Sequence, residues 1–389
     1  MSRSRREIPE ATVWVDADVT ALVELRAQLK LRGADSAPGL LAFIARFVVA
    51  GLARYPELNT RINTLDDGSQ EILRVAGVNL GLAAQTDREA GLTLGDIPGS
   101  GPDGLILRRD VETASAARAE PPSSSPPAAS FAAPVATSSS EAGAAGSGTD
   151  PRSGLPVLDR APLRGVRKTV ADTMSRSRRE IPEATVWVDA DVTALVELRA
   201  QLKLRGADSA PGLLAFIARF VVAGLARYPE LNTRINTLDD GSQEILRVAG
   251  VNLGLAAQTD RGLLVPSVRN ADRMNTRELD VEIRRLAALA REGRATPADL
   301  TSGTFTLNNY GVFGVDGSAA IINFPESAIL GVGRILDRPW VVNGALAVRK
   351  VTELTLSFDH RVCDGGTAGG FLRYVADAME NPGSVLADL

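Results

Sequence analysis

The sequence predicts an α/β fold, because the spacing of its side chains indicates both a half-buried strand and apolar helices. Residues 351–358 alternate between large apolar and mostly polar side chains, which is typical of a strand with one buried face. From Phe371 onward, apolar residues recur at helical spacing, so a helix should follow that strand. Residues 213–226 are the most apolar helical stretch and predict a further helix earlier in the chain.

The single histidine of the chain, His360, comes directly after the predicted strand. Residues 357–366 read Ser-Phe-Asp-His-Arg-Val-Cys-Asp-Gly-Gly, and they also contain the single cysteine, Cys363. An imidazole titrates near neutral pH and is the usual general base for a hydroxyl or a thiol. A lone surface histidine is the simpler interpretation, but the position between a strand and a helix N-terminus favours a catalytic one. We interpret Cys363 as a small packed residue rather than a nucleophile.

The pattern His-x-x-x-Asp-Gly, formed by His360 and Asp364, resembles the catalytic signature of dihydrolipoyl acyltransferases, the core enzymes of 2-oxo acid dehydrogenase complexes. The resemblance extends over residues 155–389. It includes the blocks at residues 162–168, 228–232, 261–266, 303–309, 321–323, 325–326 and 328–333. Residues 308–311 (Asn-Asn-Tyr-Gly) and 363–366 (Cys-Asp-Gly-Gly) look most like the branched-chain members of the family.

The resemblance implies a two-layer α/β sandwich similar to chloramphenicol acetyltransferase, with the active site shared between subunits of a trimer. It makes His360 the base that takes the proton from a thiol as the sulfur attacks a thioester. Asn308 stands where family members usually carry a Ser or Thr that donates to the oxyanion. This is a departure, and a strand-end amide is the alternative interpretation. Asp364 is expected to organise the loop by pairing with an arginine, and Asp359 and Arg361 are expected to be structural in a similar way.

A basic segment, Arg164, Arg167 and Lys168, is a candidate for contacting the phosphates of coenzyme A. The alternative is an ordinary solvated basic helix face. None of the four lysines (Lys30, Lys168, Lys203 and Lys350) lies in the Asp-Lys-Ala type of turn that the family lipoylates. The lipoyl group is therefore expected to be supplied from elsewhere, or as free dihydrolipoamide.

Composition excludes several other classes of protein. The net charge of −4 argues against a nucleic-acid binder. One cysteine rules out an intramolecular disulfide framework, and one histidine beside it makes a protein metal site unexpected, so no metal is predicted. The N-terminus lacks an apolar signal core, and residues 213–226 are too few to span a bilayer. We expect a cytoplasmic protein without membrane contacts.

An internal repeat is the second large signal, since residues 1–88 are identical to residues 174–261. We call them copy one and copy two. An identical copy of this length indicates a recent DNA event or an assembly error rather than a structural repeat. Copy one lacks Asn308 and His360, so it carries no chemistry of the family's kind. Its apolar helix face repeats that of copy two without the partner half, through Leu40, Leu41, Ile44, Phe47 and Val48. Copy one should either compete with copy two for that half, as in domain swapping, or be loosely packed or partly disordered.

Four segments follow from these observations. Residues 1–88 are the partial copy, and residues 89–113 resemble the second half of the family's peripheral subunit-binding domain. Residues 114–154 form an Ala-, Pro- and Ser-rich flexible linker, and residues 155–389 form the catalytic domain. One tandem duplication of residues 89–261 accounts for this order. It predicts that the genomic sequence before codon 1 encodes Arg-Lys-Thr-Val-Ala-Asp-Thr in frame.

The leading functional hypothesis is acyl transfer, of a branched-chain acyl group, between a dihydrolipoyl thiol and coenzyme A in a homotrimer or larger homo-oligomer. The missing first helix of the subunit-binding remnant argues against firm binding of the decarboxylase and dihydrolipoyl dehydrogenase components. Two alternatives stay open. One is a catalytically weak structural core, and the other is an enzyme like chloramphenicol acetyltransferase that acts on a free small molecule.

Overall fold

The computed structural model describes residues 8–32, 38–81, 148–206, 210–259 and 262–385. The subunit-binding remnant and most of the predicted linker therefore lie outside the described residues. The described chain forms two compact units. One comprises residues 1–21 and 163–389, and we call it the catalytic unit; the other comprises residues 22–162. None of the described helices combines the length and the apolar character that crossing a membrane requires.

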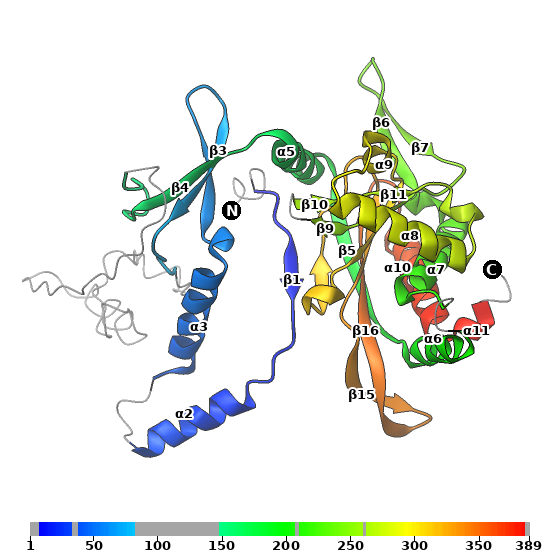
Figure 1. Cartoon of the computed structure of the whole chain (residues 1–389), viewed down its shortest axis with the longest axis horizontal. Coiled ribbons are helices and arrows are strands. Elements are labelled where there is room, and N and C mark those ends of the chain that lie inside the picture. Colours follow the sequence, from blue (N-terminus) through cyan, green and yellow to red (C-terminus); the bar gives the residue numbers. More distant parts are fainter. Residues whose placement is uncertain (1–7, 33–37, 82–147, 207–209, 260–261, 386–389) are drawn as a thin grey trace, which may run out of the picture. The chain divides into compact units, whose positions relative to one another are not determined.

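The catalytic unit is built on a seven-stranded mixed sheet, which confirms the predicted α/β class (Figure 1). Its strands run in the order β11-β8-β12-β14-β16-β15, and β5 pairs with β16 as well. β12 is parallel to β8 and to β14, and the other pairs are antiparallel. The strands of this sheet are β5 (Glu183–Asp191), β8 (Leu253–Leu255), β11 (Ser267–Val268), β12 (Phe305–Asn309), β14 (Ala328–Val332), β15 (Leu336–Val342) and β16 (Ala345–Asp359).

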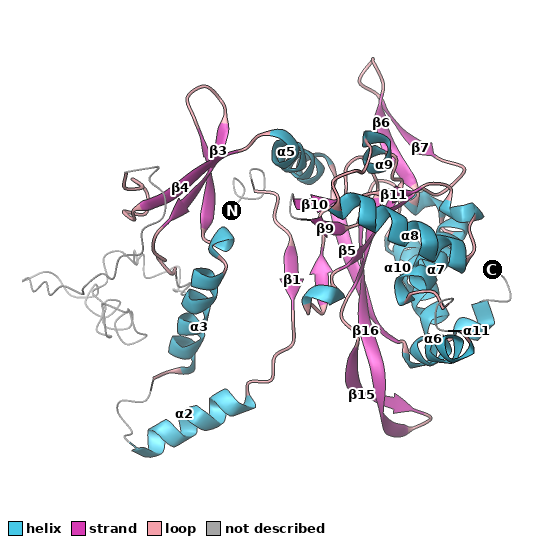
Figure 2. Ribbon diagram, viewed as in Figure 1, coloured by secondary structure: helices cyan, strands magenta, loops and turns pink. Residues whose placement is uncertain are grey.

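Helices cover the sheet and complete the two layers (Figure 2). They are α6 (Thr193–Arg205), α7 (Leu213–Arg227), α8 (Thr276–Arg291) and α10 (Gly365–Glu380). α10 packs on β5, β16 and α7, and α7 also packs on α8. The remaining described α-helices and strands of the unit are α5 (Gly165–Glu180), α9 (Pro297–Thr301), α11 (Pro382–Val385), β1 (Thr12–Trp14), β6 (Thr233–Thr237), β7 (Gln243–Arg247), β9 (Ala257–Thr259), β10 (Gly262–Leu264) and β13 (Gly317–Ala319). Three short 3-10 helices, Pro229–Leu231, Ala271–Arg273 and Gly311–Phe313, complete the described elements.

Aromatic packing between copy two and the C-terminal half forms the centre of the core. Phe220 of α7 is fully buried, and Phe371 of α10 makes edge contacts with Phe305 and Tyr228 at centroid distances of 5.7 and 6.3 Å. Gly224 is the residue that lets the helices approach, because a Cβ there would lie 2.8 Å from the ring of Phe371. The helix of copy two is therefore buried by residues of the C-terminal half, and copy one is not followed by such a half.

In its described residues the second unit has a three-stranded antiparallel sheet, two α-helices and a short 3-10 helix, Pro56–Leu58. Its elements are α2 (Thr20–Arg32), α3 (Leu40–Arg54), β2 (Thr60–Thr64), β3 (Gln70–Val75) and β4 (Val157–Pro162), in the strand order β2-β3-β4. The apolar face of α3 is exposed as predicted, and Leu41 and Phe47 are each 60% exposed. Residues 148–154, predicted as linker, instead contain a turn in which Asp150 is buried. Short-range hydrogen bonds from Ser153 to that carboxylate hold the turn.

The identical helices α3 and α7 provide a matched stability test. We expect Phe220→Ala to lower the unfolding free energy of the catalytic unit by about 3–5 kcal/mol, because it leaves a cavity in a packed core. Phe47→Ala should change it by about 0.5 kcal/mol or less, because that side chain is exposed. Chemical denaturation followed by tryptophan fluorescence measures both, since Trp14, Trp187 and Trp340 all belong to the catalytic unit. Equal losses would contradict the assignment of the core to copy two.

Candidate active site

His360 lies immediately after β16, and its side chain is exposed. Its backbone N–H donates to the carbonyl of Pro182 (3.0 Å), just before β5. The imidazole lies against the ring of Phe358, with 5.4 Å between ring centroids and a tilt of 42°. Phe358 is itself fully buried, so the exposed imidazole is supported from the core. The predicted position at a strand end is thus observed.

The neighbours of His360 stabilise the turn. Asp359 is buried and accepts hydrogen bonds from the backbone N–H of Arg361 (3.0 Å) and from its guanidinium (2.7 Å). The hydrogen bond to Asp359 raises the pKa of the Arg361 guanidinium further above its usual range. This ion pair closes the turn on itself, which agrees with the structural role expected for both residues.

Asp364 is the N-cap of α10 rather than the partner of an arginine. Its carboxylate accepts from the backbone N–H groups of Gly366 (3.0 Å) and Thr367 (3.1 Å), and the bond from Thr367 contributes most to lowering its pKa. No arginine pairs with it in the part of the chain that the structure describes. The cap also explains why the helix begins at Gly365, earlier than Phe371, where the apolar spacing first became visible.

Asn308 does not meet His360 within one chain. Asn308 of β12 lies opposite Gly331 of β14, which lies opposite Thr355 of β16. His360 follows the end of β16 and is five residues beyond Thr355, a displacement of ~17 Å at ~3.3 Å per residue. The side-chain amide of Asn308 is half-buried and has no hydrogen-bond partner among the described residues. It therefore remains available as a donor to another group.

The basic residues Arg164, Arg167 and Lys168 are all exposed at the start of α5. Arg164 is the N-cap, and Lys168 pairs with Asp172 at 2.9 Å. The next turns of the same helix line a cavity of about 500 Å³. Its lining is mostly apolar, with Val170, Met174, Leu264, Val265, Pro297, Leu300 and Phe324, and Glu326 also lines it. His360 is not one of its lining residues.

Glu326 is a titratable residue whose setting the sequence did not indicate. It is 3% exposed, and it accepts from the hydroxyl of Thr306 (2.6 Å) and the amide of Asn323 (2.8 Å). Burial raises its pKa from 4.5 to about 7. The sequence showed only a Pro-Glu pair between apolar stretches, and the burial comes from residues distant in the chain. A carboxyl of this kind can hold or release a proton near neutral pH.

Burial also affects the protonation of the Cys363 thiol. It packs against the main core cluster, and burial raises the pKa of its thiol to about 11. The thiolate population is therefore very low at neutral pH. This agrees with a packed residue and argues against a nucleophile.

The raised pKa of Glu326 predicts a pH-dependent stability. The folded state holds this proton up to about pH 7 and the unfolded state only to about 4.5, so stability is full below pH 4.5 and falls as pH rises to 7. The loss is roughly 3 kcal/mol. Glu326→Gln should abolish this pH dependence. The variant should then have a higher unfolding free energy than the unchanged protein at pH 8 but not at pH 4.5, as measured by chemical denaturation. Glu244→Gln, at an exposed site, is the control. A difference that is the same at both pH values would refute the raised pKa.

Comparison with known proteins assigns the chain to a family. Residues 1–99 and 157–387 match the family described as 2-oxoacid dehydrogenases acyltransferase (catalytic domain), and residues 87–112 match the e3 binding domain. The dihydrolipoyllysine-residue acetyltransferase component of the pyruvate dehydrogenase complex from Bacillus subtilis is 37% identical over 306 residues, covering 77% of this chain and 66% of the relative. The lipoamide acyltransferase component of the branched-chain alpha-keto acid dehydrogenase complex from Pseudomonas aeruginosa is 35% identical, covering 78% and 66%.

Solved structures agree with this placement. A probable dihydrolipoamide acetyltransferase from Listeria monocytogenes is 37% identical, with a TM-score of 0.52 over 57% of this chain and 93% of that chain. The Azotobacter vinelandii dihydrolipoamide acetyltransferase is 28% identical, with a TM-score of 0.54 over 59% and 94%. The chain spans about two thirds of the length of its first two curated relatives. The family match covers well over half of the chain, which therefore belongs to the 2-oxoacid dehydrogenase acyltransferase family and carries its catalytic domain.

Proposed function

We propose that this protein transfers an acyl group between a dihydrolipoyl thiol and coenzyme A, with His360 as the general base. The observation that carries the proposal is the position of His360 in a domain of this family. The imidazole is exposed, supported by the buried Phe358 ring, and fixed by the bond from its backbone N–H to Pro182. A thiol that reaches this ring can lose its proton as the sulfur attacks.

The step balances without an external reactant. The attacking sulfur forms a bond to the thioester carbonyl carbon, His360 takes the thiol proton, and the carbonyl oxygen becomes an oxyanion. Collapse of this intermediate breaks the original C–S bond, and the imidazolium returns the proton to the departing sulfur. Because a free thiol is mostly protonated at neutral pH, this base contributes to the rate directly.

We assign the oxyanion donor to the amide of Asn308 from a neighbouring chain. Within one chain Asn308 and His360 are displaced by ~17 Å along the sheet, whereas an oxyanion donor must lie within ~3 Å of the developing charge. Self-association, as a homotrimer or a larger assembly, resolves this separation. Arg164, Arg167 and Lys168 are assigned to the phosphates of coenzyme A, and the apolar cavity beside the same helix to the uncharged part of a substrate.

The proposal also covers the acyl group, the source of the lipoyl group and the partner proteins. A branched-chain acyl group is favoured by residues 308–311 and 363–366, and the lipoyl group is supplied by another domain or chain. The decarboxylase and dihydrolipoyl dehydrogenase components are candidate partners through residues 87–112.

An isobutyryl group should be preferred to an acetyl group by roughly tenfold in kcat/KM. Steady-state assays with the two coenzyme A thioesters and free dihydrolipoamide measure this ratio.

Removal of the base is the direct test. His360→Ala in the full chain should lower kcat for acyl transfer from isobutyryl-coenzyme A to dihydrolipoamide by about 10²–10⁴-fold. His360 is exposed, so the variant should keep its fold, which circular dichroism verifies. A folded variant with full activity would exclude His360 as the base. A folded, self-associating unchanged protein that transfers nothing would favour a structural core instead.

Mixing two inactive variants tests the shared site. His360→Ala and Asn308→Ala should each be weak alone. If subunits exchange freely, about a quarter of the sites in an equal mixture combine an intact His360 with an intact Asn308 from another chain. Activity should therefore return on mixing after dissociation and reassembly. Activity that stays at the level of the separate variants would show that the two residues do not meet between chains.

A further inference from the structure

Copy one does not remain unattached in the catalytic unit, because β1 pairs with β13. The pairing is antiparallel, with Thr12 opposite Ala319 and Trp14 opposite Gly317. The Trp14 ring fills the space beside Gly317, where a Cβ would clash with it. It also makes an edge contact with Trp187 at 6.3 Å between centroids. A strand of copy one is thus docked on the C-terminal half.

Charged groups continue this contact beyond the strand. The backbone N–H of Asp16 donates to the carboxylate of the buried Asp316 (2.7 Å), and the Asp16 carboxylate lies 3.3 Å from the guanidinium of Arg338. Arg334 pairs with Asp316 and also donates to the carbonyl of Asp16 (3.4 Å). Arg334 and Arg338 thus both contact Asp16, the acidic residue that follows β1.

Every residue of this docked strand occurs again in copy two. Thr12, Trp14 and Asp16 are the equivalents of Thr185, Trp187 and Asp189 in β5. Among the described strands β5 pairs with β16 alone, so its other edge is open. Trp187 is 64% exposed on this strand. A second copy of the chain therefore presents the same side chains that dock here in cis.

The backbone polarity of the open edge also matches. The N–H of His360 bonds to the carbonyl of Pro182, and the N–H of Val192 bonds to the carbonyl of Lys350 (2.8 Å). Since bonding alternates along an antiparallel pair, the even-numbered residues of β5 face β16, and Thr185 and Trp187 direct their N–H and C=O groups to the open edge. In β1 the equivalent group, the carbonyl of Trp14, accepts from the N–H of Asp316 (3.1 Å).

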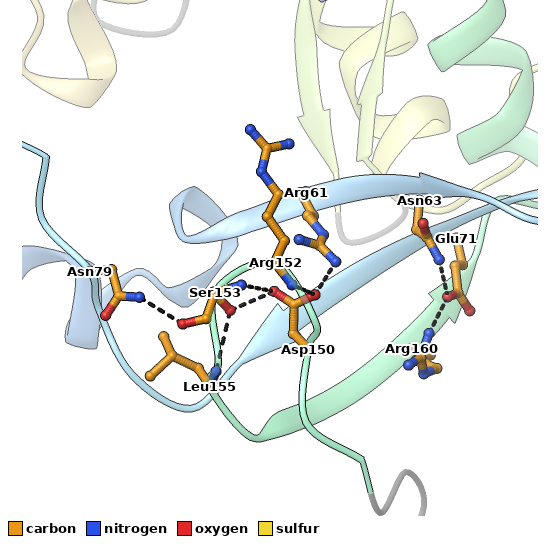
Figure 3. Close-up of polar contacts among 9 residues, drawn as sticks. All are labelled: Arg61, Asn63, Glu71, Asn79, Asp150, Arg152, Ser153, Leu155 and Arg160. Atoms are coloured by element: carbon orange, nitrogen blue, oxygen red, sulfur yellow. Dashed lines mark hydrogen bonds and ion pairs between the residues drawn. The ribbon is translucent and has the colours of Figure 1, made fainter. Parts of the chain in front are cut away.

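A second strand of copy one makes an analogous contact in the other unit. β3 pairs with β4, and Arg160 of β4 forms an ion pair with Glu71 of β3, as Figure 3 shows. The equivalent strand of copy two, β7, pairs only with β6 among the described strands. Glu71 is buried, whereas its equivalent Glu244 is exposed. The edge that β4 covers in copy one is therefore open in copy two.

We propose that copy one occupies, in cis, two strand positions that copy two of a second chain binds in trans, and so limits self-association. The two positions are the edge of β13 and the strand β4. Open strand edges readily pair with another chain. A segment of the same chain competes with an advantage in effective concentration that commonly reaches the millimolar range. This inference concerns assembly, so an inactive enzyme that shows the predicted association would still support it.

A matched pair of variants tests the β13 edge. Trp14→Gly in the full chain should release β1, so that self-association occurs at about tenfold lower protein concentration, measured by sedimentation velocity. Adding Asp189→Arg should cancel this gain, because the arginine would face Arg334 and Arg338 of the neighbouring chain. Asp189 lies opposite Glu353 in the β5–β16 pair, so an arginine there keeps an oppositely charged neighbour and β5 should remain folded.

A peptide with the sequence of residues 8–16 gives a measurement that does not depend on the folding of Asp189→Arg. Added in excess to Trp14→Gly, it should return the protein to the mass distribution of the unchanged chain. The proposal is overturned if Trp14→Gly leaves the mass distribution unchanged over the whole concentration range. It is also overturned if the double variant associates as strongly as Trp14→Gly, or if the peptide has no effect.

The β4 strand is tested by the same logic. Glu71→Arg places like charges beside Arg160 and should increase self-association, and adding Glu244→Arg should remove the increase. A gain that survives the second substitution would show that β4 does not accept β7 of another chain.

Discussion

The pairing of β5 with β16 is the contact on which the rest of the catalytic unit depends. It runs without a break from Asp191 opposite Val351 to Glu183 opposite Asp359. This ladder attaches copy two to the C-terminal half, and its last bond, from His360 to Pro182, fixes the candidate base. Because α10 packs on both strands, the helix that follows the catalytic turn is held by the same pair.

The two identical copies show how far burial depends on context. Phe220 is fully buried and Phe47 is mostly exposed, although their local sequences do not differ. α3 and α7 are both helices, so the local sequence determines the secondary structure in each. What differs is the set of partners, because only copy two is covered by β16 and α10. Helix formation is thus local here, whereas the core is formed by contacts distant in sequence.

The sequence predicted those parts of the site that depend on local order. The strand, the turn with His360 and the structural role of Asp359 and Arg361 follow from alternation, glycines and neighbouring charges. The cap by Asp364 was missed, although Asp is one of the residues preferred at a helix N-cap. Glu326 and the separation of Asn308 from His360 were beyond local reasoning. The first depends on tertiary burial, and the second on the register of three strands.

The docking of β1 has a consequence for how such a gene would diverge. A duplicated segment that already fits a surface needs no new substitution to act as an internal competitor. Drift in copy one at Thr12, Trp14 or Asp16 would then change assembly while the catalytic half stays untouched. Substitutions at the equivalent positions of copy two would be selected against, because β5 also pairs with β16 and holds the sheet together. The two copies would be expected to lose their identity first at the positions that β1 and β5 share.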